Sequence, residues 1–212
     1  LDGDTLFLGY DTDELEASLK AVFADGEPIE ILNEGESGVF ILDQTPFYGE
    51  SGGQVGDCGR LFACEAAADV TDTTKSQGHH LHHVTVTAGS FTLGDQVKAK
   101  IDVGLRNRTR LNHSATHLLH EALRIQLGSH ILQKGSLVNS QRLRFDFSHV
   151  EPVTPAELSA VNRIVNQQIR QNSKVFIEIM AMDAAIDAGA TALFGEKYGD
   201  EVRVLTMGTD SF

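Results

Sequence analysis

Hydrophobic and polar positions alternate through much of residues 15–105, which indicates short β-strands. The alternation is clearest in one run, at Ala17, Leu19, Ala21 and Phe23. The Asp25-Gly26 pair that follows this run is typical of a hairpin turn. Further strands are expected over residues 28–32, 38–42, 84–87 and 97–101. Several short strands at this spacing predict a small β-barrel or sandwich in the first half of the chain.

From Arg106 onward the hydrophobic period becomes that of a helix, at about 100° per residue. One side of this predicted helix carries Leu111, Ala115, Leu118, Ala122 and Ile125. The opposite side carries His113, His117, His120 and Arg124. The histidines are therefore expected to face water or a cleft, and Gly128 is the expected end of the helix.

A second helix is predicted from Thr154 to about Gln171, because Thr154-Pro-Ala-Glu157 is a capping box with proline at the first helical position. Its expected buried face is Leu158, Val161, Ile164, Val165 and Ile169. A short helix over 183–188 should end at Gly189, and strands are expected over 143–147, 175–180 and 202–207. The predicted fold class is α+β, with a small β-barrel subdomain at 1–105 followed by an α+β subdomain at 106–212.

The composition is that of a soluble globular protein with one large or two small domains: 212 residues, 41% hydrophobic and 22% charged. No run approaches the roughly 18 apolar residues of a membrane span, so no membrane partner is expected. No signal peptide is visible, and the start at Leu1 suggests a fragment. The two cysteines, Cys58 and Cys64, are too few for a disulfide scaffold, which favours reduced thiols in the cytoplasm.

The net charge of −13 is unevenly distributed. Residues 1–100 hold 5 basic and 18 acidic side chains, whereas residues 101–212 hold 12 of each. Within 104–144, seven basic side chains stand against Glu121 alone. This basic segment is either a nucleic-acid contact or a solvated helix face.

Three groups of residues could carry chemistry, and each also has a purely structural interpretation. His113 and His117 form the pattern H-x-x-x-H. On a helix, these two imidazoles could coordinate one metal ion, or they could simply be exposed. The glycine-rich stretch 47–57 can present backbone amides to a ligand or make a tight turn between strands. The histidines at 79, 80, 82 and 83 would alternate between the two faces of a strand, as a metal site or as an exposed strand end.

Residues 42–57 read Leu-Asp-Gln-Thr-Pro-Phe-Tyr-Gly-Glu-Ser-Gly-Gly-Gln-Val-Gly-Asp, and residues 110–120 read Arg-Leu-Asn-His-Ser-Ala-Thr-His-Leu-Leu-His. These two segments and three others that follow in order resemble the editing domain of alanyl-tRNA synthetases of the bacterial type. The others are Gln-Lys-Gly-Ser-Leu-Val at 133–138, Arg-Leu-Arg-Phe-Asp-Phe-Ser-His at 142–149 and Ala-Leu-Phe-Gly-Glu-Lys-Tyr-Gly at 192–199. Free-standing alanyl-tRNA editing proteins and the threonyl-tRNA synthetase editing domain share parts of this pattern.

The resemblance implies a hydrolase that removes wrongly attached serine or glycine from tRNA(Ala), with the H-x-x-x-H helix packed on an antiparallel sheet. It implies one zinc ion held by His113 and His117 together with a later C-x-x-x-H segment, which is expected beyond Phe212. Gln133 matches an active-site glutamine of the family. Thr45, Gly52, Gly53 and Gln54 are expected to shape the amino-acid pocket. ATP would be used only in a separate aminoacylation domain of the parent enzyme, because no ATP motif is present here.

The basic segment supplies candidate contacts to the tRNA acceptor end, at Arg106, Arg108, Arg110, Arg142 and Arg144. Each could instead form an ion pair with the acidic half of the chain. Three other functions stay open: a non-catalytic tRNA-positioning module, a free-standing editing hydrolase, and an unrelated metalloenzyme that uses His79 to His83.

Overall fold

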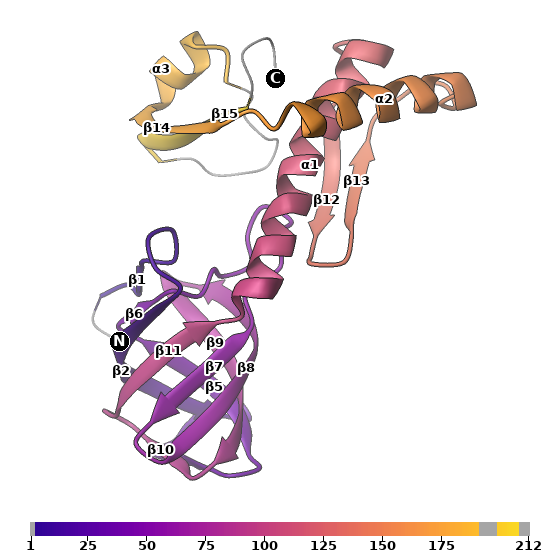
Figure 1. Cartoon of the computed structure of the whole chain (residues 1–212). Coiled ribbons are helices and arrows are strands. Elements are labelled where there is room, and N and C mark those ends of the chain that lie inside the picture. The colour runs from indigo at the N-terminus through magenta and orange to yellow at the C-terminus, as the bar shows by residue number, and fades with distance from the viewer. Residues whose placement is uncertain (1–2, 191–198, 208–212) are drawn as a thin grey trace. The chain divides into compact units, whose positions relative to one another are not determined.

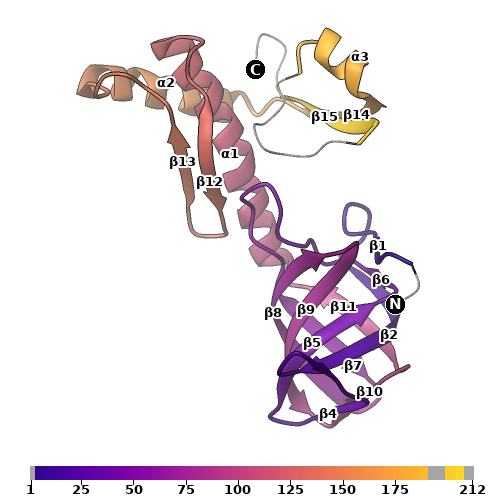
Figure 2. The same cartoon turned by 180° about the vertical axis from the view of Figure 1, so that it is seen from behind.

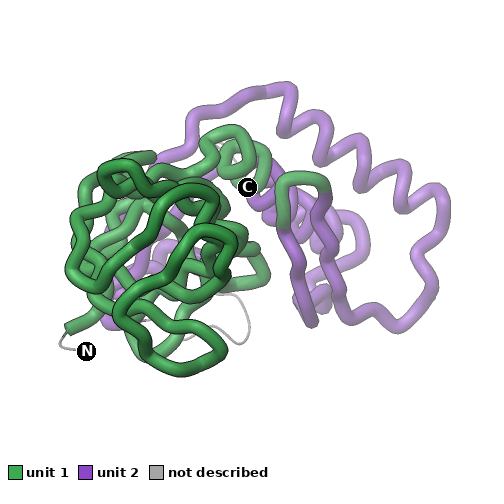
Figure 3. The backbone as a smooth tube through the Cα atoms, turned by 90° about the horizontal axis from the view of Figure 1, so that it is seen from below, with its two compact units in different colours: residues 1–110, 139–141 green, residues 111–138, 142–212 purple. Residues whose placement is uncertain are grey.

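The computed structural model describes residues 3–190 and 199–207. The chain has a mixed α/β fold with a closed six-stranded barrel (Figure 1). It divides into two compact units, residues 1–110 with 139–141 and residues 111–138 with 142–212, as Figure 3 shows. The division falls inside helix α1 (Val103–Leu127).

The first unit is built on an antiparallel barrel. Its strands are β2 (Glu14–Ala24), β5 (Ser37–Leu42), β7 (Gly59–Ala63), β8 (Ala66–Ser76), β9 (His79–Ala88) and β11 (Gln96–Ile101). They follow the order β11-β7-β8-β9-β5-β2, and β2 pairs back onto β11, for example at Ala17 and Val97. Of the two predicted architectures, a barrel and a sandwich, the first unit therefore has the barrel.

Short strands complete this unit. The parallel ladder of β1 (Leu6–Phe7) with β6 (Gln44–Thr45) and the antiparallel ladder of β4 (Ile31–Asn33) with β10 (Ser90–Thr92) lie at opposite ends of the barrel (Figure 2). Strand β3 (Glu27–Pro28) extends the β2 hairpin. The predicted turn is confirmed, because Asp25 and Gly26 both have positive φ angles, of 51° and 83°.

The predicted alternation of β2 is correct only in its first part. Ala17 and Leu19 are buried in the barrel core, but the next buried residue is Val22, while Ala21 and Phe23 are only partly buried. The pairing register with β5 shifts between Leu19 and Ala21. One extra residue moves all later side chains to the other face, so the strict period of two is lost.

The second unit has a separate small core. Ala122 and Leu123 of α1 pack with Ile131 and with Val161 of α2 (Pro155–Gln171). The antiparallel hairpin of β12 (Gln133–Val138) and β13 (Leu143–Phe147) adds Phe145 and Phe147 to this cluster. The predicted strand over 143–147 is confirmed. The capping box is also confirmed, since the Thr154 hydroxyl accepts from the Glu157 backbone while the Glu157 carboxylate accepts from that of Thr154.

The predicted apolar faces of both helices are wrong at their ends. Leu111 and Ile125 of α1 are 70% and 52% exposed, and Leu158 and Ile169 of α2 are exposed as well. The core is small: it contacts α1 between Leu119 and Leu127 and α2 between Val161 and Val165, so periodicity alone overestimates the buried stripe.

The remaining described elements match the prediction. β14 (Val175–Ala181) pairs antiparallel with β15 (Glu201–Met207), and α3 (Met182–Asp187) follows β14. The segment 192–199 of the family pattern lies outside the described residues except for Gly199. Among the residues described, no helix is both long enough and apolar enough to cross a membrane.

Candidate functional site

The two histidines of the H-x-x-x-H pattern are neighbours on α1. The ring centroids of His113 and His117 are 5.0 Å apart, and their planes are 14° from parallel. The pKa of His117 is lowered to about 4, mainly by burial and to a smaller extent by the neighbouring His113 and His120. His117 is therefore held as a neutral imidazole, the form that ligates metal ions.

His120 does not share an open face with the other two histidines. Its ring centroid lies 5.0 Å from that of Phe145 on β13, and a hydrogen bond joins it to the backbone of Ile131. Its Nε2 atom is buried without a hydrogen-bond partner, and burial lowers the pKa of the ring. Of the two expected surroundings of the histidines, water or another part of the chain, His120 therefore has the second.

Within residues 3–190 and 199–207, no three side chains of His, Cys, Asp or Glu come together in a way that could hold a metal ion. The pair His113 and His117 supplies two adjacent imidazoles. A complete tetrahedral site would need further ligands from outside these described residues.

Gln133 opens β12 of the second unit and is partly buried there. It pairs with Phe147, and the register of the hairpin shifts between Gln133 and Gly135. Of the basic candidates in the second unit, Arg144 forms an exposed ion pair with Asp146 at 3.1 Å. The roles predicted for Gln133, Arg142 and Arg144 stay predictions.

The glycine-rich stretch joins β6 to β7 in the first unit and contains a tight turn. The backbones of Ser51 and Gln54 exchange two hydrogen bonds, and Gly52 and Gly53 between them have φ angles of 58° and 79°. Both angles favour glycine, so the structural interpretation accounts for these two residues. Gly52 is exposed and Gly53 is partly exposed. Binding of a ligand by the backbone amides of this stretch remains a prediction.

Thr45, at the start of this stretch, is fully buried. Its hydroxyl lies 2.8 Å from Nε2 of His82 and accepts from the backbone N–H of Phe47 at 3.1 Å. The Thr45 hydroxyl therefore makes two hydrogen bonds within the barrel, and its role in an amino-acid pocket stays a prediction.

The histidine run on β9 is not an exposed strand end, which corrects the structural interpretation of that motif. His80 is 6% exposed and His82 is completely buried, whereas His79 and His83 lie on the other face as predicted. Burial lowers the pKa of His80 and of His82 to about 4. His80 stacks on Phe7 with ring centroids 5.5 Å apart, so this strand contributes to packing at the β1 end of the barrel.

Arg106 departs most clearly from its predicted role. It is 7% exposed and forms a buried ion pair with Asp57, the last residue of the glycine-rich stretch. The predicted phosphate contact is therefore wrong for Arg106, and the alternative expectation, an ion pair with the acidic half of the chain, is confirmed for this residue. Arg108 and Arg110, two and four residues further along α1, are exposed.

Sequence patterns include Asp57 and His82 in candidate motifs but do not predict the partner of either residue. Arg106 and Asp57 are separated by 49 residues, and His82 and Thr45 by 37, so no local spacing connects either pair. Only the closure of the barrel brings them together.

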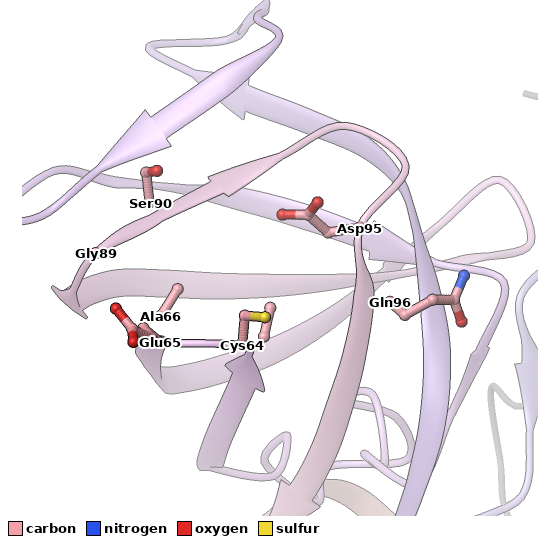
Figure 4. Close-up of a pocket in the computed structure, with 8 residues that line it drawn as sticks. Cys64, Glu65, Ala66, Gly89, Ser90, Asp95 and Gln96 are labelled. Atoms are coloured by element: carbon pink, nitrogen blue, oxygen red, sulfur yellow. The ribbon is translucent and has the colours of Figure 1, made fainter.

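A depression in the surface lies elsewhere on the barrel. Figure 4 shows it beside the turns that contain Cys64 and Gly89, with Glu65, Ser90 and Asp95 in its lining. It contains none of the predicted site residues.

Comparison with known proteins points to one family. Residues 1–105 match the family described as tRNA synthetases class II (A). Over 210 residues, the chain is 56% identical to the alanine–tRNA ligase of Pseudomonas entomophila. The matched segment makes up 99% of this chain and 24% of that protein. The chain is 54% identical over 210 residues to the alanine–tRNA ligase of Pseudomonas fluorescens, with the same coverage. The chain thus spans about a quarter of the length of the curated relatives it matches.

Proposed function

Because this chain is homologous to one segment of bacterial alanine–tRNA ligases, we propose that it is the editing region of such an enzyme. The reaction is hydrolysis of the ester that joins a wrong amino acid, serine or glycine, to the terminal ribose of tRNA(Ala). In the proposed domain organisation, residues 1–105 form the barrel subdomain and residues 106–212 the editing subdomain. The observation that carries the proposal is the adjacent pair His113 and His117 on α1, in a chain with these relatives.

His113 and His117 would hold part of the ligand set of a zinc ion. Two imidazoles whose centroids are 5.0 Å apart at positions i and i+4 fit this role, and the low pKa of His117 keeps its ring available for coordination at neutral pH. When bound, zinc would supply positive charge near the developing oxyanion of the ester. The remaining ligands are expected outside the described residues.

Gln133 would act on the attacking water or on the substrate. A carboxamide is neutral at every working pH, so it can donate or accept a hydrogen bond but cannot remove a proton. Gln133 lies at the start of β12 and pairs there with Phe147 of β13. This pairing supports a role that depends on a fixed position. Hydrolysis is then assisted by orientation of the reacting groups.

Thr45, Gly52, Gly53 and Gln54 would shape the pocket for the wrong amino acid. A pocket that hydrogen-bonds the serine hydroxyl spares alanine, because alanine would leave the polar groups of the pocket unpaired. The buried position of Thr45 and the two-glycine turn support a rigid pocket wall rather than a mobile one.

The tRNA acceptor end would contact the exposed basic side chains of the segment 104–144, among them Arg108 and Arg110. The whole enzyme would attach alanine to tRNA(Ala) with ATP in a different domain, in the cytoplasm, where translation takes place. Both statements extend to this chain what its relatives' name, alanine–tRNA ligase, implies.

The test is deacylation of serine-charged tRNA(Ala) by a full-length alanine–tRNA ligase that carries this segment. His113→Ala with His117→Ala should abolish serine release and lower the zinc content, and Gln133→Ala should reduce release without changing zinc. His79→Ala, which removes a partly exposed histidine of the barrel, is the matched control. Undiminished release by the double variant would refute the proposal.

A non-catalytic tRNA-positioning module is the second candidate, favoured by the exposed Arg108 and Arg110 on α1. It predicts salt-dependent binding of tRNA(Ala) with no hydrolysis by the full-length enzyme. The same deacylation assay separates the two functions.

A further inference from the structure

Arg106 holds three different parts of the first unit with one side chain. Its Nε donates to both carboxylate oxygens of Asp57, at 2.9 and 2.8 Å, and its Nη2 donates to Asp57 as well. Nη1 donates to the carbonyl oxygen of Gly9 at 2.8 Å, and Nη2 to that of Pro46 at 2.8 Å. All three guanidinium nitrogens are therefore bound within the protein.

Pro46 and Asp57 are the two ends of the glycine-rich loop, which we define as residues 46–57. Inside the loop, Asp57 accepts from the backbone N–H of Tyr48 at 2.7 Å and donates its own N–H to the Tyr48 carbonyl at 2.9 Å. A single guanidinium thus fixes both ends of the loop and, through the Asp57 carboxylate, its first turn.

The opposite side of the loop rests on β8. The backbone N–H of Glu50 donates to the Thr73 carbonyl at 2.8 Å, and the Thr73 hydroxyl donates to the Asp57 carbonyl at 2.9 Å. The approach is so close that a Cβ atom on Gly56 would collide with the Thr73 carbonyl oxygen. The loop is consequently clamped between β8 and Arg106, and its shape depends on both.

The pair is not replaceable by another basic side chain. Arg106 and Asp57 are both more than nine-tenths buried, and removal of one partner from such a pair leaves the other charge unpaired. Lysine retains the charge but lacks the planar fork that reaches a carboxylate and two carbonyl groups at once.

We infer that Arg106 is a positioning residue, which with Asp57 sets the shape of the glycine-rich loop and thereby the rate at which serine is released. The part of this inference that concerns serine release rests on the proposed function. The part that concerns loop shape does not. This positioning role replaces the predicted phosphate contact. The two roles predict different effects of substitutions on kcat and KM, because a phosphate contact requires only an accessible charge.

Two substitutions separate these roles in the full-length enzyme. Arg106→Lys keeps the charge and should lower kcat for serine release at least tenfold, with KM for serine-charged tRNA(Ala) within twofold of the parent value. Asp57→Asn should cause a similar loss of kcat, and the double variant should be no worse than either single variant, since both break one clamp. A phosphate contact predicts instead a change in KM for Arg106 variants alone.

Loop shape is measured independently in the 212-residue chain by amide hydrogen exchange. Arg106→Lys and Asp57→Asn should speed exchange at least tenfold at Tyr48, Glu50 and Asp57, while amides of the core strand β5 keep their parent rates. Arg60→Lys is the matched control, because Arg60 forms an exposed ion pair with Asp69 on the same barrel. It should change neither exchange nor hydrolysis.

Each result is decisive. Unchanged exchange in the loop overturns the clamp, and faster exchange with undiminished kcat overturns its role in positioning. If exchange in β5 rises equally, the pair acts on the whole barrel and the inference is overturned. If the parent enzyme releases no serine, the proposed function fails, whereas the exchange measurement still decides whether Arg106 shapes the loop.

Discussion

The Thr45 hydroxyl donates a hydrogen bond to Nε2 of His82, 2.8 Å away, in the closed interior of the barrel. The direction follows from the other ring nitrogen, since Nδ1 lies 3.0 Å from the Phe40 carbonyl oxygen and can only donate to it. The Thr45 oxygen in turn accepts from the Phe47 N–H. Burial lowers the pKa of His82, so the ring is neutral, and this chain of three hydrogen bonds anchors the start of the glycine-rich loop to β5 and β9.

Thr45→Val should destabilise the barrel by about 1–3 kcal/mol, because valine has the same shape but leaves His82 Nε2 and the Phe47 N–H unsatisfied in the core. Urea unfolding of the chain measures this loss. Thr87→Val is the control, since the Thr87 hydroxyl is exposed and bonds only the Ala67 carbonyl, so its loss should stay within about 0.5 kcal/mol. Equal effects of the two substitutions would contradict the network.

The barrel should lose stability as the pH falls from 7 towards 4. Burial lowers the pKa of both His80 and His82 to about 4, against 6.5 for an unperturbed histidine. Between these values the unfolded chain binds protons that the folded chain excludes, so stability falls with falling pH. Each histidine should account for about 2 kcal/mol of loss at pH 5.

His80→Phe should reduce this acid sensitivity. Neither ring nitrogen of His80 has a hydrogen-bond partner among the described residues, so phenylalanine retains the stack on Phe7 without losing a polar contact seen there. Unfolding free energies at pH 7 and pH 5 give the slope for this variant and for the control His79→Gln, which replaces a partly exposed histidine. A slope unchanged by His80→Phe would show that this ring is not the titrating group.

Two leucines on α1 should differ sharply when each is changed to alanine. Leu123 is buried in the second core, so Leu123→Ala should cost about 2–5 kcal/mol. Leu111 is exposed, so Leu111→Ala should change the unfolding free energy by less than about 0.5 kcal/mol. Thermal or urea unfolding monitored in the second unit tests this, and a large cost at Leu111 would favour the apolar face expected from periodicity.

Arg108→Ala with Arg110→Ala should weaken binding of tRNA(Ala) by the full-length enzyme and make it less dependent on salt. Each lost phosphate contact should reduce the slope of log K against log salt by roughly 0.7–0.9. The matched control is Arg163→Ala with Arg170→Ala, which removes two exposed arginines of α2 outside the basic segment. An identical reduction in the control would show that only overall charge matters.

Local patterns in the sequence determine much of the secondary structure. The Asp25-Gly26 turn, the capping box at Thr154 and the strands over 143–147, 175–180 and 202–207 all depend on residues within a few positions of one another. The H-x-x-x-H spacing likewise predicts that His113 and His117 are neighbours, and their ring centroids are 5.0 Å apart. Such features are readable because neighbours along the chain remain neighbours on a helix or in a turn.

The sequence by itself therefore determined many of the elements, the mixed class and the position of the histidine pair, but it did not predict β7, β8 or β12. Tertiary structure alone decided which polar residues are internal. Closure of the barrel brings Asp57 to Arg106 and Thr45 to His82, and a bulge after Leu19 changes which side chains of β2 enter the core. Charge and periodicity describe what a side chain can do, but burial and partners depend on contacts between distant segments, and these exist only once the sheet has closed.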